Sequence, residues 1–157
     1  MKYTDIFLDL DDTLIDTATN TKITVEEVYN DYHLSEYFDS FESFFSFYHK
    51  NVSKLWNAYN KGNITKDDIQ KERFAVSLRH LEGMNDTKIQ TINEDYIERI
   101  MKKDALIEGA IDMLDYLSSK YKIHILSNGF TEMQYKKIES AGLSFAYFEN
   151  IILSDIV

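Results

Sequence analysis

Two short polar strings in the sequence carry the side chains best suited to chemistry. One is Asp-Leu-Asp-Asp-Thr-Leu at residues 9–14, the other is Ser-Asn-Gly at residues 127–129, and each follows an apolar run. Asp9 and Asp11 are two residues apart, so on an extended backbone their side chains face the same side. Two neighbouring carboxylates repel each other unless a cation or a shared proton offsets their charge. A magnesium ion is the simplest candidate for that cation.

The apolar runs are predicted to be strands of one parallel sheet. Short buried strands are expected at residues 3–10, 121–129 and 150–153, and helices at residues 110–117 and 131–141. Alternating strands and helices are typical of a parallel sheet with right-handed crossovers. Because ligands of open parallel sheets bind outside the carboxyl ends of the strands, both polar strings are expected at one functional edge.

A helical block interrupts this pattern after the first strand. Apolar residues recur at three- and four-residue spacing from about residue 19 to residue 103, and strand-like alternation nearly disappears. The spacing predicts an aromatic-rich helix face that ends at Gly62, which we interpret as core packing rather than as a ligand pocket. The residues of that face are Leu34, Phe38, Phe41, Phe45, Tyr48, Val52, Leu55 and Tyr59.

Two further helices are expected in the same block. The first starts at Asn63 or Thr65, where Asp68 is placed to form a capping box with Thr65, and Gly83 closes it. The second runs over residues 86–101. The sequence therefore predicts that the whole block is helical.

Composition and charge restrict the classes of partner. With 157 residues and 44% hydrophobic content, the chain can bury one good core. Its formal net charge of −10 disfavours binding to nucleic acid or to anionic membrane surfaces. The lysine pairs at residues 102–103 and 136–137 are interpreted as parts of solvated helix faces. Because no apolar stretch suits a signal peptide or a membrane span, we expect a soluble, cytoplasmic protein.

The two polar strings resemble the first two motifs of the haloacid dehalogenase-like hydrolase superfamily, most of whose members are phosphatases. Residues 9–14 match the first motif throughout, and residues 127–129 match the second, in which an apolar strand ends in Ser or Thr and Asn-Gly often follows. Residues 106–126 and 141–154 resemble the stretches that lead to the second and third motifs, although Glu108 stands where proline is usual. The resemblance therefore spans the whole chain.

This resemblance implies an α/β fold with a Rossmann-like parallel sheet. The core would comprise residues 1–17 and 104–157 and would be incomplete at its C-terminal end, while residues 18–103 would form an inserted all-helical cap of C1 type. The strand that contains residues 151–153 would then have an exposed edge, through which the protein could self-associate.

The same resemblance implies a magnesium-dependent phosphatase that acts on a small phosphorylated metabolite. Asp9 would be the nucleophile that forms an aspartyl-phosphate, and Asp11 would protonate the leaving alkoxide and then activate water. The metal site would use Asp9 and Asp11, the latter through its backbone carbonyl, while Ser127 and the Asn128 amide would hold the phosphoryl group. The first string and the helical cap look most like the house-cleaning nucleotide 5′-phosphatases.

Alternative hypotheses follow from what the chain lacks. It has no counterpart of the family's third-motif lysine or fourth-motif aspartate, since Asp155 resembles only the acidic position before the third motif. We therefore expect low activity from these 157 residues alone, and the alternative is a catalytically inactive fragment that acts as a binding or assembly piece. Dehalogenation is disfavoured because those relatives lack the second aspartate that Asp11 provides, whereas phosphomutase activity stays open.

No second metal site is predicted. The chain has no cysteine, and its four histidines, His33, His49, His80 and His124, lack the spacing of metal ligands. A response-regulator receiver also combines clustered aspartates with magnesium, but it has no place for a helical insertion of this size.

Overall fold

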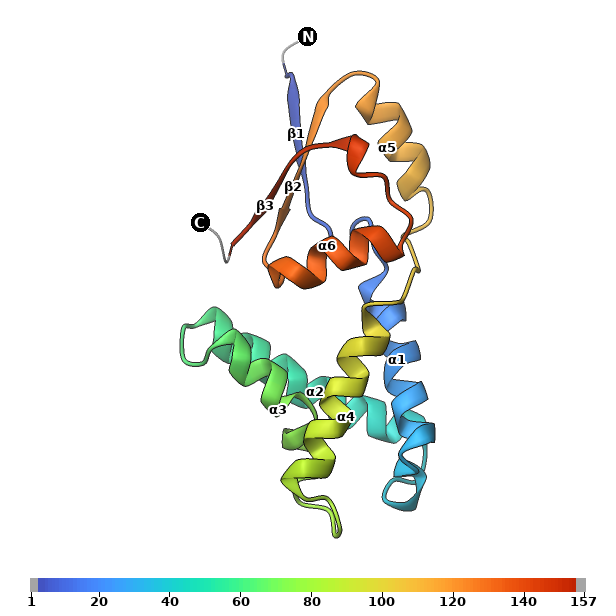
Figure 1. The fold of residues 1–157 in the computed structure, drawn as a ribbon, viewed down its shortest axis with the longest axis vertical. Coiled ribbons are helices and arrows are strands. Elements are labelled where there is room, and N and C mark those ends of the chain that lie inside the picture. The colour runs from blue at the N-terminus through green and yellow to red at the C-terminus, as the bar shows by residue number, and fades with distance from the viewer. Residues whose placement is uncertain (1–2, 155–157) are drawn as a thin grey trace. The chain divides into compact units, whose positions relative to one another are not determined.

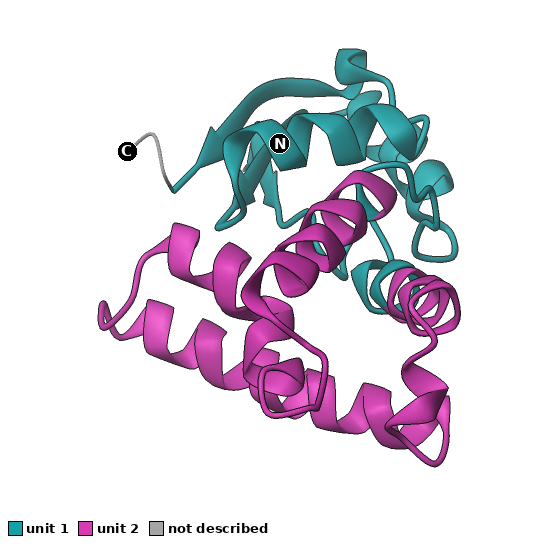
Figure 2. Cartoon of the chain, turned by 60° about the horizontal axis from the view of Figure 1, so that its bottom comes forward, with its two compact units in different colours: residues 1–21, 100–157 teal, residues 22–99 magenta. Residues whose placement is uncertain are grey.

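The structure of the protein, a computed structural model, describes residues 3–154, which form three strands and six α-helices in an α/β fold (Figure 1). The described residues form two compact units (Figure 2). The first unit comprises the described parts of residues 1–21 and 100–157, and the second unit comprises residues 22–99. The strands are β1 (Asp5–Leu8), β2 (Lys122–Ser127) and β3 (Phe148–Leu153). The helices are α1 (Thr17–Asp31), α2 (Phe41–Asn60), α3 (Lys66–Leu78), α4 (Asp86–Ile100), α5 (Ala110–Ser118) and α6 (Thr131–Ser140).

The three strands form one parallel sheet in the order β1-β2-β3. In its register Phe7 of β1 lies opposite His124 of β2, and Ile125 of β2 lies opposite Ile151 of β3. The predicted alternation of strands and helices is confirmed. Among the described residues β1 and β3 are the outer strands, and self-association through the edge of β3 stays a prediction.

One face of the sheet carries the core of the first unit. Ile125 of β2 is buried there, and helices α5 and α6 add Leu114 and Ile138 to the same core. On the opposite face Phe7 and Leu126 are 58% and 53% exposed. Parallel sheets are usually covered on both faces, so within residues 3–154 this second face is the less protected one.

Aromatic packing holds α2, α3 and α4 together in the second unit. Phe74 of α3 lies against Tyr48 of α2 and Tyr96 of α4, with ring centroids 4.9 and 5.4 Å apart. Asn93 of α4 accepts the N–H of Phe74 at 3.2 Å and donates to the carbonyl of Lys71 at 2.9 Å. The predicted helical character of this block is confirmed.

The position of the aromatic helix face was only partly predicted. Leu34 lies in a separate 3-10 turn, because Ser40 caps α2 and that helix begins at Phe41. A continuous helix cannot cross the extended backbone of a capping residue, so the expectation for Leu34 and Phe38 is wrong. The buried face also includes Phe44, which the predicted face omitted. The buried residues of α2 are Phe44, Tyr48 and Asn51.

Most helix ends follow the capping signals of the sequence. Thr65 and Asp68 form the predicted capping box of α3, with each side chain accepting the backbone N–H of the other residue. Gly62 adopts a φ of 72°, the left-handed conformation that ends α2. Helix α3 ends at Leu78, earlier than the expected Gly83, because turns occupy the interval between them.

The division into units falls inside helices α1 and α4. The assignment of residues 18–103 as a cap stays a prediction, and Asp155 lies outside the described residues. No helix in the described part of the chain is both long and apolar enough to cross a membrane.

Candidate active site

The first polar string folds into a tight loop after β1. The Leu10 carbonyl accepts the N–H groups of Leu14 and Ile15 at 3.0 and 3.1 Å, and all three side chains are buried. This turn ends β1 earlier than residue 10. Because side chains alternate along an extended chain, burial of Leu10 directs Asp9 and Asp11 to the other side. The apolar residues anchor the loop, and the two aspartates are left at the carboxyl end of β1.

Asp11 is held by donors from two helices. Lys137 Nζ of α6 lies 2.5 Å from Asp11 Oδ1, and Thr17 Oγ1 of α1 donates to the same oxygen at 2.6 Å. Gln134 Nε2 of α6 donates to Asp11 Oδ2 at 2.7 Å. Burial raises the pKa of Asp11, but the Lys137 charge and these hydrogen bonds outweigh burial and hold the pKa below the usual aspartate value. Asp11 is therefore an ionised, fixed carboxylate at neutral pH.

Ser127 ends β2 and shares a donor with Asp11. Its buried hydroxyl oxygen accepts the Gly129 N–H at 3.2 Å and Gln134 Nε2 at 2.6 Å. One side-chain amide, that of Gln134, thus bridges the loop after β1 and the end of β2. The expected convergence of the two polar strings is observed for Asp11 and Ser127.

The other two predicted site residues, Asp9 and Asn128, have exposed positions. Asp9 Oδ1 accepts the N–H of Leu10 at 2.8 Å. Asn128 Oδ1 accepts the hydroxyl of Ser154, so the Asn128 side chain is directed to the end of β3. The proposed contact of Asn128 with a phosphoryl group therefore falls to its backbone N–H. The roles of all four predicted residues stay predictions.

Asp12 serves the turn that follows β1. Its φ of 55° is left-handed, a conformation that aspartate tolerates better than most residues. Asp12 Oδ1 accepts the N–H of Ala18 at 3.0 Å, in the first turn of α1. This carboxylate is therefore engaged in local structure.

Sequence reasoning missed Gln134 and Lys137. The pair at residues 136–137 was interpreted as solvated, which is wrong for Lys137, because its side chain is only 15% exposed and contacts Asp11. Lys136 is exposed. The usable signal was the spacing of three residues between Gln134 and Lys137, which places both on one face of the helix that follows the second polar string.

The donors present fit magnesium through Asp9 and not through the Asp11 side chain. Magnesium takes oxygen ligands, usually one or two carboxylates together with water and substrate phosphate. The exposed Asp9 carboxylate suits this role, whereas both Asp11 carboxylate oxygens already accept hydrogen bonds. Asp11 can offer its backbone carbonyl instead, which is the donor that the family resemblance implies. Within residues 3–154 no group of three or more His, Cys, Asp or Glu side chains is placed to hold a metal.

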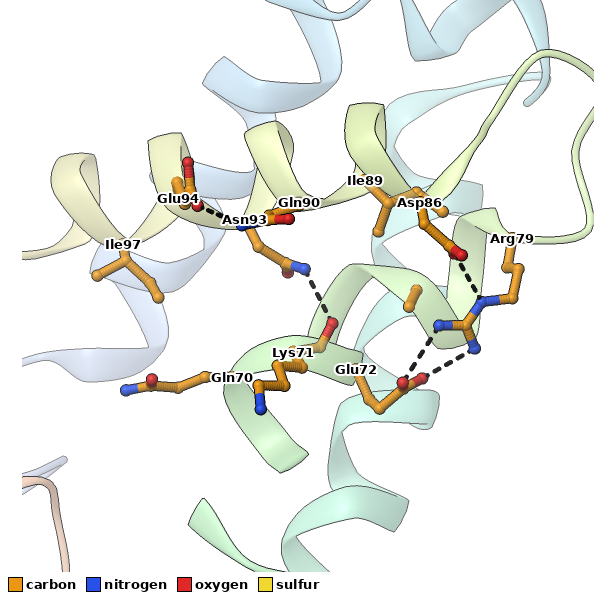
Figure 3. A pocket seen from close by; sticks show the side chains of 11 residues that line it. Gln70, Lys71, Glu72, Arg79, Asp86, Ile89, Gln90, Asn93, Glu94 and Ile97 are labelled. Carbon is orange, nitrogen blue, oxygen red and sulfur yellow. Dashed lines mark hydrogen bonds and ion pairs between the residues drawn. The ribbon is translucent and has the colours of Figure 1, made fainter. Parts of the chain in front are cut away.

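A separate pocket of about 370 Å³ lies within the second unit, between α3 and α4 (Figure 3). Its charged lining is largely paired: Arg79 lies 3.1 Å from Glu72 and 3.4 Å from Asp86. Gln90 donates to Glu94 at 2.8 Å. Because these groups satisfy one another, the pocket offers a ligand few polar partners.

Comparison with known proteins decides the family. The sequence profile of the haloacid dehalogenase-like hydrolases matches residues 6–157. The chain belongs to this family. The matched range of this haloacid dehalogenase-like hydrolase includes both polar strings.

Two curated relatives of this haloacid dehalogenase-like hydrolase are bacterial proteins. The HAD-hydrolase YfnB of Bacillus subtilis (strain 168) is 24% identical over 155 residues, which are 98% of this chain and 63% of YfnB. The pyrimidine 5′-nucleotidase YjjG of Escherichia coli (strain K12) is 28% identical over 158 residues, which cover 100% of this chain and 65% of YjjG. The chain therefore spans less than two thirds of the length of either relative.

Solved structures share the fold of this haloacid dehalogenase-like hydrolase. The crystal structure of YfnB bound to magnesium has a TM-score of 0.83 at 24% identity and covers 99% of this chain and 65% of YfnB. The L-2-haloacid dehalogenase of Xanthobacter autotrophicus has a TM-score of 0.66 at 16% identity, with coverage of 98% and 58%. At these identities the likeness shows the fold, which confirms the predicted α/β class.

Proposed function

We propose that the protein hydrolyses a small phosphate monoester through an aspartyl-phosphate intermediate on Asp9. The observation that carries this proposal is the pairing of an exposed carboxylate, Asp9, with a fixed one, Asp11, at the carboxyl end of β1. Asp9 attacks phosphorus, and Asp11 gives a proton to the leaving alkoxide and later takes one from the attacking water. The nucleophile must be accessible to the ester, which suits the exposed Asp9, and the acid and base must be held in place, which suits Asp11.

The ionised resting state of Asp11 is compatible with its role as an acid. Lys137 holds Asp11 charged in the structure. A phosphate dianion that enters the site competes for the Lys137 charge, so the pKa of Asp11 rises when the ester binds. Asp11 is then protonated for the first step and becomes a base for the second.

The C-terminal end of β2 supplies donors for the phosphoryl oxygens in this proposal, and the N-terminal end of α6 lies next in the chain. The Ser127 hydroxyl and the Asn128 backbone N–H bind these oxygens in the proposal, and α6 starts shortly afterwards at Thr131. The positive end of a helix dipole favours anions at such a position.

Magnesium completes the charge balance of the proposed site. Asp9 and the Asp11 carbonyl would hold the ion, which would supply positive charge against the ester. The magnesium-bound structure of YfnB supports this choice of ion.

The proposed substrate is a nucleoside 5′-monophosphate, with pyrimidine nucleotides first. The support is the 28% identity to YjjG, a pyrimidine 5′-nucleotidase, over the whole of this chain. Dehalogenation is the competing reaction within the family, and the presence of Asp11 favours phosphate ester hydrolysis, because an acid is needed to protonate an alkoxide but not a halide.

The test is a substrate panel on the full-length protein. Nucleoside monophosphates, sugar phosphates and p-nitrophenyl phosphate are assayed for phosphate release with magnesium and with EDTA, and L-2-chloropropionate is assayed for chloride release. We expect phosphate release that EDTA abolishes, with the highest kcat/KM for a pyrimidine nucleotide. Chloride release without phosphate release would overturn the proposal.

A further inference from the structure

We propose that Gln134 is a positioning residue that fixes the Ser127 hydroxyl as a hydrogen-bond donor to the phosphoryl group, and that Gly129 is required to make room for it. This inference rests on the proposed function. It assigns a role to a residue of α6 outside both polar strings.

The orientation of the Gln134 amide is dictated by Asp11. The Gln134 side chain is fully buried, and its Nε2 lies 2.7 Å from Asp11 Oδ2. Thr17 and the Lys137 ammonium donate to the other Asp11 oxygen, and Asp11 Oδ2 is the acceptor that faces Gln134, so the amide presents its NH₂ group and not its carbonyl. Gln134 Oε1, the other end of the amide, is buried and has no protein partner. No donor near Oε1 therefore fixes the orientation of the amide, which indicates that Asp11 sets it.

The fixed amide determines what the Ser127 hydroxyl can do. A hydroxyl has two acceptor lone pairs and one hydrogen to donate. The Gly129 N–H and Gln134 Nε2 both donate to Ser127 Oγ, at 3.2 and 2.6 Å. With its acceptor positions used by these two donors, Ser127 has its hydrogen left to give. A phosphoryl oxygen, which accepts but does not donate, is the matching ligand.

Gly129 is needed for space and not for backbone conformation. A Cβ at residue 129 would lie 2.0 Å from Gln134 Nε2 and 2.3 Å from Gln134 Cδ, far inside contact distance. The positive-φ glycines of the described chain do not include Gly129. The glycine of the second polar string therefore allows the close approach of Gln134 to Ser127.

A double-mutant cycle on the full-length protein separates positioning from a general structural effect. The affinity for inorganic phosphate is measured by calorimetry, with magnesium present, for the wild type, Gln134→Leu, Ser127→Ala and the double variant. We expect Gln134→Leu to weaken binding about tenfold when Ser127 is present, as is common when a supporting residue is lost, and less than about twofold when Ser127 is already alanine. Lys136→Leu, an exposed change on the same helix, should leave the affinity unchanged.

A second variant guards against a folding defect in Gln134→Leu. Gln134→Met keeps the length of the side chain but removes the NH₂ donor without adding a charge, so the Ser127 hydroxyl is no longer fixed and phosphate binding weakens. Equal losses with and without Ser127, or full affinity in Gln134→Met, would overturn the inference alone, provided that the wild type hydrolyses phosphate esters. A wild type that hydrolyses no ester would overturn the proposed function and the inference with it.

Discussion

Lys137 Nζ lies 2.5 Å from Asp11 Oδ1, although the two residues are 126 positions apart in the sequence. The contact joins α6 to the loop after β1. It gives the acidic first motif a cation from within the first unit. The charge state of Asp11 therefore depends on α6.

Replacing Lys137 with methionine should raise the pKa of Asp11. The variant keeps most of the apolar stem but removes the charge, so burial is opposed only by the neutral donors Thr17 and Gln134. Carbon-detected NMR titration of the Asp11 carboxyl in metal-free protein measures the change. Lys136→Met is the control and should leave this pKa unaltered.

The lowered pKa of Asp11 makes the stability of the first unit depend on pH. Because the folded pKa of Asp11 is lowered, its stabilising contribution is present above the usual aspartate pKa and is lost as pH falls through the lowered value. In Lys137→Met the contribution should be smaller, and its loss should be complete at a higher pH. A titration curve of Asp11 that is identical in both proteins would contradict the assigned contact.

Asp11→Asn should slow hydrolysis selectively for esters with poor leaving groups. An alkoxide needs a proton from Asp11, whereas p-nitrophenolate leaves without one. We expect a loss of about a hundredfold or more in kcat for a nucleotide and a much smaller loss for p-nitrophenyl phosphate. Equal losses for both esters would argue against the acid role.

Gly129→Ala should destabilise the first unit by about 1–3 kcal/mol, the usual range for forcing a methyl group into a packed site. The added carbon would meet Gln134 Nε2 at 2.0 Å. Adding Gln134→Ala to Gly129→Ala should recover part of the stability, because the clash is removed. Hydrogen exchange in β2 reports the change, and a double variant that is no more stable than Gly129→Ala would contradict the assigned clash.

Thr65→Ala should destabilise the second unit by about 1 kcal/mol, because it removes one half of the capping box at the start of α3. Urea unfolding followed by Trp56 fluorescence measures the effect. Ser46→Ala, at an exposed position inside α2, is the control and should not destabilise. Comparable losses in both variants would show that the cap has no special effect.

Local signals account for the parts of the fold that the sequence predicted well. The capping box at Thr65 and the left-handed Gly62 depend on residues within one turn of a helix end. The two polar strings could be placed for a similar reason. Each follows a strand, and a short apolar run of neighbouring residues is enough to indicate that strand. These features were predicted because their causes lie close together in the chain.

The features that were missed depend on distant contacts or on a single cap. Lys137 looks like a surface residue until α6 packs beside the first loop, which only the tertiary structure shows. Gln134 carries no sequence signal of its own beyond its spacing from Lys137. The aromatic face of α2 was misplaced because Ser40 interrupts a pattern that otherwise continues through it.

The central claim is that Asp9 becomes phosphorylated during turnover, and chemical trapping tests it directly. The full-length protein is mixed with magnesium and its best phosphate ester, quenched during turnover and treated with borohydride, which reduces an aspartyl-phosphate to homoserine. Peptide mass spectrometry should then find homoserine at position 9, both in the wild type and in Asp12→Asn, whose altered carboxylate serves only the turn. Homoserine at position 11 or 12, or steady ester hydrolysis with none at position 9, would contradict the account.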